Sequence, residues 1–205
     1  MVERDKNGIY LSQVTYIEKV LAIFGMEECK RVVTPALDPP GTESPKLESD
    51  VPYKQAIGSL LYISTRTRPD IAYAVGYVAR QMHDPTEEDW IAVKRIFRYL
   101  QSTKNLRLKY SMQNSEILGY SDASYASNSK DRKSTSGYIF ISNGPISWRS
   151  KKQPIVSISS VEAEEIASEI NSEISPKVIL LEDNQAAIKL AKNEILSDHS
   201  KHIDV

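Results

Sequence analysis

The chain has 205 residues, of which 40% are hydrophobic and 26% charged, and its formal net charge is −1. This composition is typical of globular proteins with one large or two small domains, and the near-neutral balance argues against nucleic-acid binding driven by bulk charge. No apolar run is long enough to predict a membrane span, the charged N-terminus does not resemble a secretory signal peptide, and the single cysteine, Cys29, excludes an internal disulfide framework.

The first 52 residues predict a hairpin, a helix and a loop. Asn7-Gly8 lies between two short apolar segments, a strong hairpin signal. We expect Ser12 or Thr15 to cap a helix that ends at Gly25. Its apolar face consists of Ile17, Val20, Leu21 and Phe24. Residues 38–52 contain four prolines among serines and acids, which predicts an exposed loop.

Two further helices are expected before residue 110. Pro69 suits the first turn of one helix, and Thr86 caps the other, where three acids follow and complement the helix dipole. The two apolar stripes are Ile71, Val75, Val78 and Met82, then Trp90, Val93, Phe97 and Leu100. Lys94, Arg95 and Arg98 lie off the stripe, and we expect a solvated face rather than contact with a duplex. Arg66, Thr67, Arg68 and Asp70 are expected at a loop-to-helix junction, with phosphate binding as the alternative.

From residue 113 the pattern changes to strands. EILGYSDASYA predicts a strand that carries Asp122, and Asn143-Gly144 predicts a turn between GYIFIS and PISWRS. A helix is expected over 160–174, followed by a buried strand at VILLED and a short helix. The expected fold class is α/β in the α+β sense, with a helical segment over 1–112 and a mixed sheet with helices over 113–205.

Carboxylates in this second half raise the possibility of metal chemistry. Asp122 and Asp183 lie on predicted strands, and EAEE lies on the helix between them. Acids brought together repel one another unless cations neutralise them, and Mg²⁺ prefers oxygen ligands and suits phosphodiester hydrolysis. From spacing alone, an ordinary strand-end acid, a helix cap and a solvated helix face are the better explanation of these residues.

Longer strings carry a specific resemblance. YSDASYASNSKDRKSTSGYIF, ISWRSKKQPIVSISSVEAE, EDNQAAIKLAKN and DHSKHIDV resemble, in this order, the ribonuclease H blocks of copia-type retrotransposon Pol polyproteins. YKQAIGSLLYISTRTRPDIAYAV and DWIAVKRIFRYLQST are similar to the reverse transcriptase segment that follows the polymerase palm. The resemblance therefore implies the C-terminal part of a reverse transcriptase over 1–112 and a truncated ribonuclease H-like domain over 113–205.

The resemblance implies three metal-binding and catalytic acids: Asp122, Glu164 and Asp183. Helical geometry alone does not choose between Glu162 and Glu164, because they flank the apolar stripe on opposite sides, but the family's register favours Glu164. The fourth family aspartate and the paired aspartates of the polymerase site match no residue here. Mg²⁺ is the implied cofactor.

Local departures from the family predict weak chemistry. Only 18 residues separate Glu164 from Asp183, where the family has a longer helix, loop and strand. Ser124, Tyr125 and Glu165 replace residues that are usually Asp, Trp and an aromatic. Because metal affinity depends on the number and charge of the ligands, we expect little or no nuclease activity.

Two basic segments, SKDRK and WRSKK, flank the predicted strands. Their candidate phosphate contacts to an RNA–DNA hybrid are Lys130, Arg132, Lys133, Arg149, Lys151 and Lys152. A solvated hairpin surface is an equally good explanation. Between them, Ser134, Thr135 and Ser136 have no histidine–acid partners, and we interpret them as a capped turn rather than as nucleophiles.

Three functions remain open. The first is a remnant of retrotransposon replication machinery that acts on nucleic acid in the cytoplasm or nucleus. The second is a secreted effector of the RxLR type, a class that includes copia-derived reading frames and acts on host proteins in plant cells. This chain has no Arg-x-Leu-Arg string, and the nearest is RYLQ at 98–101. The third is an active nuclease that obtains its missing ligand from a partner chain.

Overall fold

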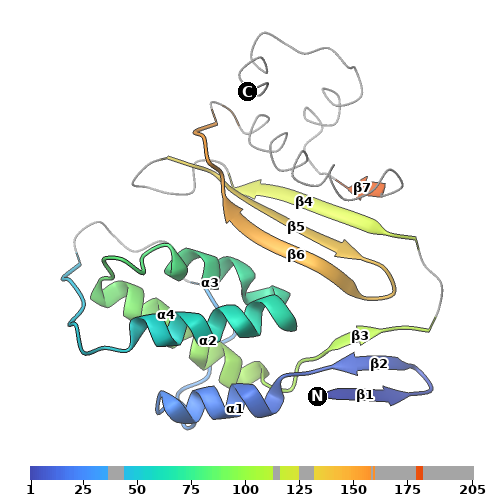
Figure 1. The fold of residues 1–205 in the computed structure, drawn as a ribbon, viewed down its shortest axis with the longest axis horizontal. Helices are drawn as coiled ribbons and strands as arrows, with labels where there is room; N and C mark the ends of the chain where they lie inside the picture. The colour runs from blue at the N-terminus through green and yellow to red at the C-terminus, as the bar shows by residue number, and fades with distance from the viewer. Residues whose placement is uncertain (37–43, 113–115, 125–131, 158, 160–178, 182–205) are drawn as a thin grey trace. The chain divides into compact units, whose positions relative to one another are not determined.

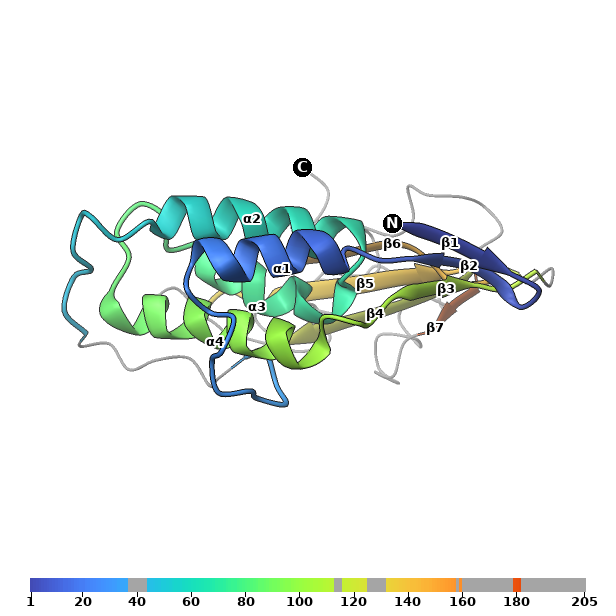
Figure 2. The ribbon, with the colours of Figure 1, turned by 90° about the horizontal axis from the view of Figure 1, so that it is seen from below.

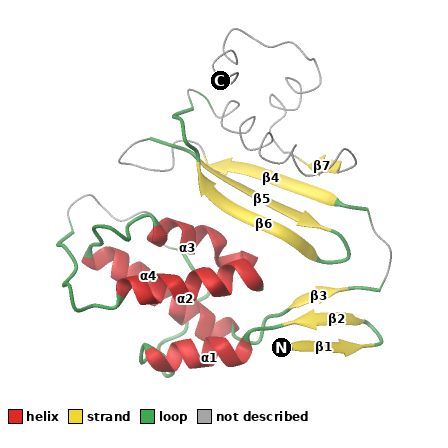
Figure 3. Ribbon diagram, in the orientation of Figure 1, coloured by secondary structure: helices red, strands yellow, loops and turns green. Residues whose placement is uncertain are grey.

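The computed structural model describes residues 1–36, 44–112, 116–124, 132–157, 159 and 179–181 (Figure 1). The chain forms two compact units, Met1–Gln113 and Asn114–Val205. Unit 1 combines helices with a small sheet, and the described part of unit 2 consists of strands (Figure 3). The expected α+β class is confirmed, whereas the assignment of 1–112 and 113–205 to two enzyme segments stays a prediction.

Unit 1 begins with the predicted hairpin, displaced by one residue. Strands β1 (Val2–Asp5) and β2 (Gly8–Leu11) pair antiparallel, so Lys6 and Asn7 form the turn and Gly8 already belongs to β2. Gly8 has φ +147°, and a Cβ there would lie 2.2 Å from the carbonyl oxygen of Tyr110. Glycine is therefore required at this position, where β2 pairs with β3 (Leu108–Tyr110). Strand β3 and its pairing with β2 were not predicted from the sequence.

Helix α1 (Val14–Ile23) ends as predicted but begins differently. Its N-cap is Gln13, which makes no side-chain capping bond, so neither Ser12 nor Thr15 caps the helix. At the other end Gly25 adopts φ +64°, and the backbone N–H of Met26 donates to the carbonyl of Leu21. This is the Schellman arrangement, which glycine favours because it tolerates a left-handed backbone.

Helix α2 (Tyr53–Arg66) was missed in the sequence, although its buried residues recur at helical spacing. They are Tyr53, Ala56, Ile57, Leu60, Ile63 and Ser64. An exposed glycine in its middle and a preceding proline-rich stretch weaken the helix signal. The hydroxyl of Tyr53 donates to the carbonyl oxygen of Val78 over 2.8 Å, and burial raises the pKa of this phenol well above its ordinary range.

The next two helices follow the sequence prediction closely. Pro69 opens a 3₁₀ turn, η1 (Pro69–Ile71), which leads into α3 (Ala72–Ala79). Helix α4 (Glu87–Thr103) is capped by Thr86, whose side chain accepts from the N–H of Asp89 while the Asp89 carboxylate accepts from the N–H of Thr86. This reciprocal pair is a capping box, with aspartate in the position more often held by glutamate or glutamine.

The helices of unit 1 pack around one apolar core (Figure 2). Phe24, beyond the end of α1, stacks on Phe97 of α4 with ring centroids 5.0 Å apart. The fully buried side chains of the core include Ile17, Leu21, Ile57, Leu60, Ile71, Val75, Ile96, Phe97 and Leu100.

A buried cation joins the start of η1 to the end of α4. Arg68 is 1% exposed, and its guanidinium donates to the Asp70 carboxylate at 2.7–3.2 Å and to the carbonyl and hydroxyl oxygens of Thr103. Tyr99 donates its hydroxyl to the same carboxylate over 2.9 Å. Burial alone raises the pKa of Asp70, but the hydrogen bonds and charge of Arg68 outweigh it and hold the pKa below the ordinary value. With its guanidinium occupied in this way, Arg68 is a structural residue rather than a phosphate ligand.

The arginines of α4 also bind the chain itself. Arg98 donates to the carbonyl of Lys30 over 2.6 Å, and Arg95 donates to the carbonyls of Thr34 and Ala36. The expected solvated face is therefore wrong for these two arginines, because they hold the extended segment that follows α1. Backbone carbonyls in that segment find their donors on α4 instead of in a sheet.

The described part of unit 2 is a four-stranded mixed sheet with the order β6-β5-β4-β7. Strands β4 (Leu118–Ser124), β5 (Thr135–Ile141) and β6 (Pro145–Lys152) pair antiparallel, whereas β7 (Ile179–Leu181) runs parallel to β4. The predicted turn at Asn143-Gly144 joins β5 to β6, with Asn143 at φ +58°. The two helices expected after residue 160 lie outside the described residues.

None of the helices in the described segments combines the length and apolar character that crossing a bilayer requires.

The Arg68 network predicts a large effect on stability. Arg68→Met removes the cation and leaves a partly buried carboxylate without its partner, so the free energy of unfolding of unit 1 falls by about 3 kcal/mol. Urea unfolding followed by helical circular dichroism measures this loss. Arg107→Met is the control, because its pair with Glu3 is about half exposed and contributes less than about 1 kcal/mol. Equal losses in the two variants would contradict a special role for Arg68.

Candidate metal and nucleic-acid site

Asp122 lies on β4, which has a strand on each side. It is exposed and stands opposite Gly137 of β5, so no neighbouring side chain on that strand covers the carboxylate. Side chains alternate along a strand, which places Asp122 on the face that Tyr120 and Ser124 share. An exposed carboxylate beside a glycine has room for a hydrated cation, and in this respect it suits Mg²⁺.

The two other predicted acids, Glu164 and Asp183, lie outside the described residues. In the described ranges, no three His, Cys, Asp or Glu side chains come close enough to hold a metal. Strand β7 pairs with β4 from Leu118 opposite Ile179 to Tyr120 opposite Leu181. The convergence of Asp122, Glu164 and Asp183 therefore stays a prediction.

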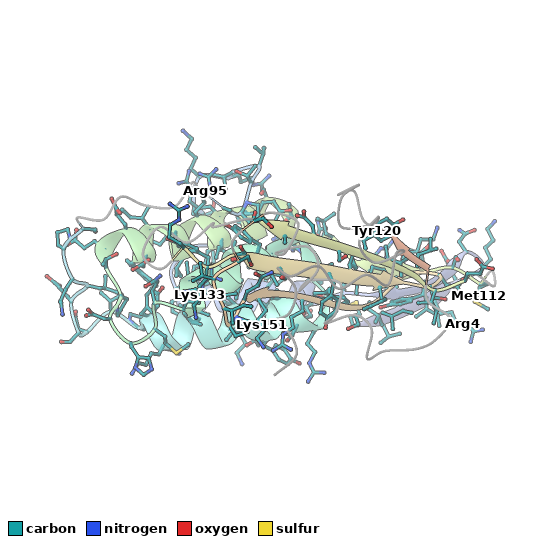
Figure 4. All side chains as sticks on the ribbon, turned by 90° about the horizontal axis from the view of Figure 1, so that it is seen from above. Arg4, Arg95, Met112, Tyr120, Lys133 and Lys151 are labelled. Atoms are coloured by element: carbon teal, nitrogen blue, oxygen red, sulfur yellow. The ribbon has the colours of Figure 1, made fainter. Side chains whose placement is uncertain are left out.

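The basic residues of the first segment have different surroundings. Lys130 lies outside the described residues, and Arg132 is exposed with φ +57°. Lys133 is half-buried and donates its ammonium to the carbonyl oxygen of Pro154, so it contributes to local structure. Lys133 lies at the same end of the β5–β6 pair as Lys151 (Figure 4).

The second basic segment is divided between two faces of the sheet. Lys152 pairs with Thr135, which in turn pairs with Ser124, and this row lies on the Asp122 face. Arg149 and Lys151 pair with Tyr138 and Ser136, so they lie on the opposite face. WRSKK is thus not one cluster, and a ligand on the Asp122 face reaches Lys152 but not its neighbour Lys151. The period-2 alternation of a strand was the sequence signal for this division.

A buried polar network, not anticipated from sequence, joins the ends of β5 and β6. Gln153 is 2% exposed, and its amide nitrogen donates to the Ser136 hydroxyl over 2.8 Å. Its amide oxygen accepts from the Ser157 hydroxyl over 2.7 Å, and its backbone N–H donates to the carbonyl of Ser134. Ser134, Thr135 and Ser136 are therefore not a capped turn, because two of them belong to β5 and all three are buried.

Comparison with known proteins decides the family. No protein-family model matches the sequence. The chain is 39% identical to the retrovirus-related Pol polyprotein from transposon TNT 1-94 of Nicotiana tabacum, over 99% of this chain and 17% of that polyprotein. It is 35% identical to the Pol polyprotein from transposon RE2 of Arabidopsis thaliana, over 98% of this chain and 15% of that polyprotein.

The chain belongs to the copia-type retrotransposon Pol polyprotein family. It spans less than a fifth of the length of these two polyproteins. The alignment to the TNT 1-94 polyprotein runs over 230 residues, so at least 25 of those positions have no counterpart among the 205 residues of this Pol-related chain. An internal shortening relative to the family was expected between Glu164 and Asp183.

A relative of another kind covers part of the same Pol-related sequence. Secreted RxLR effector protein 161 of Plasmopara viticola is 45% identical over 58% of this chain and 84% of the effector.

The polar network of this Pol-related chain predicts a second stability effect. Gln153→Leu leaves the hydroxyls of Ser136 and Ser157 buried without this partner, so the free energy of unfolding of unit 2 falls by about 2 kcal/mol. Unfolding is followed by the fluorescence of Trp148 in a Trp90→Phe background, because Trp90 is the one other tryptophan and lies in unit 1. Arg149→Gln, an exposed change on β6, is the control and is expected to have almost no effect. A loss no greater than that of Arg149→Gln would show that the network is dispensable.

Proposed function

We propose that this Pol-derived chain is a remnant of element replication machinery whose second unit binds an RNA–DNA hybrid but cleaves it little or not at all. The observation that carries the proposal is the position of Asp122, exposed on the strand that separates an antiparallel neighbour from a parallel one. The family resemblance assigns metal binding to the residue at this position.

Sequence offsets support a shared carboxylate site. Asp122 follows Tyr120 by two residues, and Asp183 follows Leu181 by the same number, where Tyr120 and Leu181 are partners in the parallel pairing. We propose that Asp122, Glu164 and Asp183 are the residues that would hold Mg²⁺. The ion supplies charge neutralisation and water activation when it is bound, and the exposed carboxylate of Asp122 is the oxygen ligand that such an ion prefers.

We attribute the weak cleavage to residues that this chain lacks internally relative to the TNT 1-94 polyprotein. At least 25 positions of the TNT 1-94 relative have no counterpart, and the expected place of the deletion lies between two of the three acids. Two-metal hydrolysis needs carboxylates held at fixed separation, and a shortened connection disturbs that geometry. Binding to phosphates is less demanding, since it depends on the positions of cations more than on exact alignment.

The sheet register supports a proposed binding face for the hybrid, the face that carries Asp122. Lys152 shares the Asp122 face, so it is the cation of β6 that contacts phosphate when the hybrid lies over the acids. Arg149 and Lys151 face the other way and make no such contact. The proposed place of action is inside the cell, in the cytoplasm or nucleus, where the nucleic acid is found.

We expect the full chain to bind a labelled RNA–DNA hybrid without Mg²⁺-dependent cleavage. Lys152→Gln lowers the affinity several-fold and reduces the slope of log K against log salt by about 0.9, the value for one lost phosphate contact. Lys151→Gln changes neither quantity, because its side chain lies on the opposite face. Fluorescence anisotropy over a salt series measures both variants.

Asp122→Asn provides the control for chemistry. Cleavage by the natural chain that disappears in Asp122→Asn would overturn the inactive assignment and show an active nuclease, alone or with a ligand from a partner chain. Equal effects of Lys152→Gln and Lys151→Gln would overturn the proposed binding face.

The similarity to an RxLR effector favours a second candidate, an interaction protein that acts on host factors after secretion. The effector is matched over most of its own length, so the shared region accounts for nearly all of that protein. In this alternative the fold is retained while nucleic-acid chemistry is not used.

Expression of the full chain in plant leaf cells tests the effector candidate. An effector alters cell death or localises to one compartment, and Asp122→Asn together with Lys152→Gln leaves that response unchanged. Loss of the response in this double variant, or no response to the natural chain, would exclude the effector reading.

A further inference from the structure

Helix α2 presents a row of four exposed residues at intervals of four: Lys54, Gly58, Tyr62 and Arg66. Residues four apart are neighbours on a helix, offset by about 40°, so the row rises about 18 Å along α2 while it winds over about a third of the helix circumference. The opposite face of α2 carries the buried residues of the core. The row is thus a surface feature that the packing of unit 1 does not use.

Gly58 is the residue of the row that the fold does not require. Its φ is not positive, and a Cβ built on it meets no atom within 4 Å. Alanine here would favour the helix, because glycine in a helix interior costs backbone entropy. What the glycine provides is bare helix backbone that a ligand can approach closely.

Tyr62 supplies an aromatic surface next to this bare backbone. It is 47% exposed, and the ring of Tyr16 meets it edge to face with centroids 5.0 Å apart. The guanidinium carbon of Arg66 lies 5.7 Å from the centroid of the Tyr62 ring. The ring is therefore supported by two neighbours while almost half of its surface is open to a ligand.

The two charged residues of the row, Lys54 and Arg66, are both basic. Helix α2 contains no acidic residue, and neither Lys54 nor Arg66 forms an ion pair in the part of the chain that the structure describes. The hydroxyls of Ser59 and Thr65 donate back to carbonyls of their own helix, so they do not compete for a ligand. Two cations at the ends of the row favour an extended anionic partner over an apolar one.

We propose that the row Lys54–Gly58–Tyr62–Arg66 binds a single nucleic-acid strand. Lys54 and Arg66 contact phosphates, one base stacks on Tyr62, and the sugar–phosphate backbone passes close to α2 at Gly58. A single strand is preferred to a duplex because stacking on a protein ring needs a base whose face is free. The length of the row matches roughly five stacked nucleotides. This site lies in unit 1 and does not rest on hybrid binding by unit 2.

Fluorescence anisotropy with the full chain and a labelled oligothymidylate tests the site. Tyr62→Ala weakens binding about tenfold. Arg66→Gln lowers the slope of log K against log salt by about 0.7, the value for one phosphate of a single strand. Gly58→Gln separates the proposal from a structural role, because it raises the urea midpoint of unit 1 while it weakens binding at least several-fold.

Tyr73→Ala is the matched control, since Tyr73 is an exposed tyrosine of α3 outside the row, 39% exposed, and its loss leaves binding unchanged. Absence of binding by the natural chain overturns the proposal. Unchanged oligothymidylate binding in both Gly58→Gln and Tyr62→Ala also overturns the proposal. If these variants keep that binding but abolish self-association in sedimentation, the row is a protein-docking face instead. Loss of oligothymidylate binding in Lys152→Gln alone would place the strand on unit 2 and likewise reject the α2 site.

Discussion

The charged side chain of Arg68 is almost fully buried, and the polar contacts that compensate this buried charge connect distant segments of unit 1. An isolated cation in a protein interior is prohibitively costly, so each of its donors needs an acceptor. Asp70 provides the opposite charge from η1, and Thr103 provides two oxygens from the last turn of α4. Because Arg68 and Thr103 are 35 residues apart in the sequence, the hydrogen bonds between them fix where η1 and α3 begin relative to where α4 ends. The apolar core supplies most of the stabilising free energy, while this polar contact specifies one arrangement of the helices.

In unit 2, the candidate site depends on the position of one strand. One neighbour of β4, β5, runs antiparallel to it, and the other, β7, runs parallel. The exposed side chain of Asp122 on β4 stands opposite Gly137 of β5. The same register that exposes the acid also assigns the lysines of β6 to separate faces. The basic motif WRSKK is continuous in the sequence, yet only one of its two lysines, Lys152, lies on the same face of the sheet as Asp122. For the proposed nucleic-acid binding, this distinction matters more directly than net charge does.

Local signals in the sequence predicted local structure well. Thr86 with its acids, Gly25, and the alternating residues around Asp122 gave a cap, a helix end and a strand that the structure contains. Helix α2 was not predicted because Gly58 and the preceding proline-rich stretch weaken the helix signal, although its buried residues recur at helical spacing. The interpretation of Ser134–Ser136 as a turn failed for a different reason: their burial depends on Gln153, which lies on the far side of a hairpin. The contact of Arg68 with Thr103, and which lysine of β6 shares the Asp122 face, likewise depend on pairings that no short window of sequence contains. Of the candidate site, the strand bearing Asp122 was predictable, whereas its relation to Glu164 and Asp183 remains a prediction carried by family resemblance.

The position of β6 at the end of the described sheet has a consequence for solubility. An outer strand offers unsatisfied backbone groups to other chains, and lysine or arginine side chains along it discourage edge-to-edge aggregation. Arg149 and Lys151, which face away from the acid, fit this protective role. Acetylation of Lys151 would remove one of these two charges and so weaken the protection of this edge against pairing with another strand.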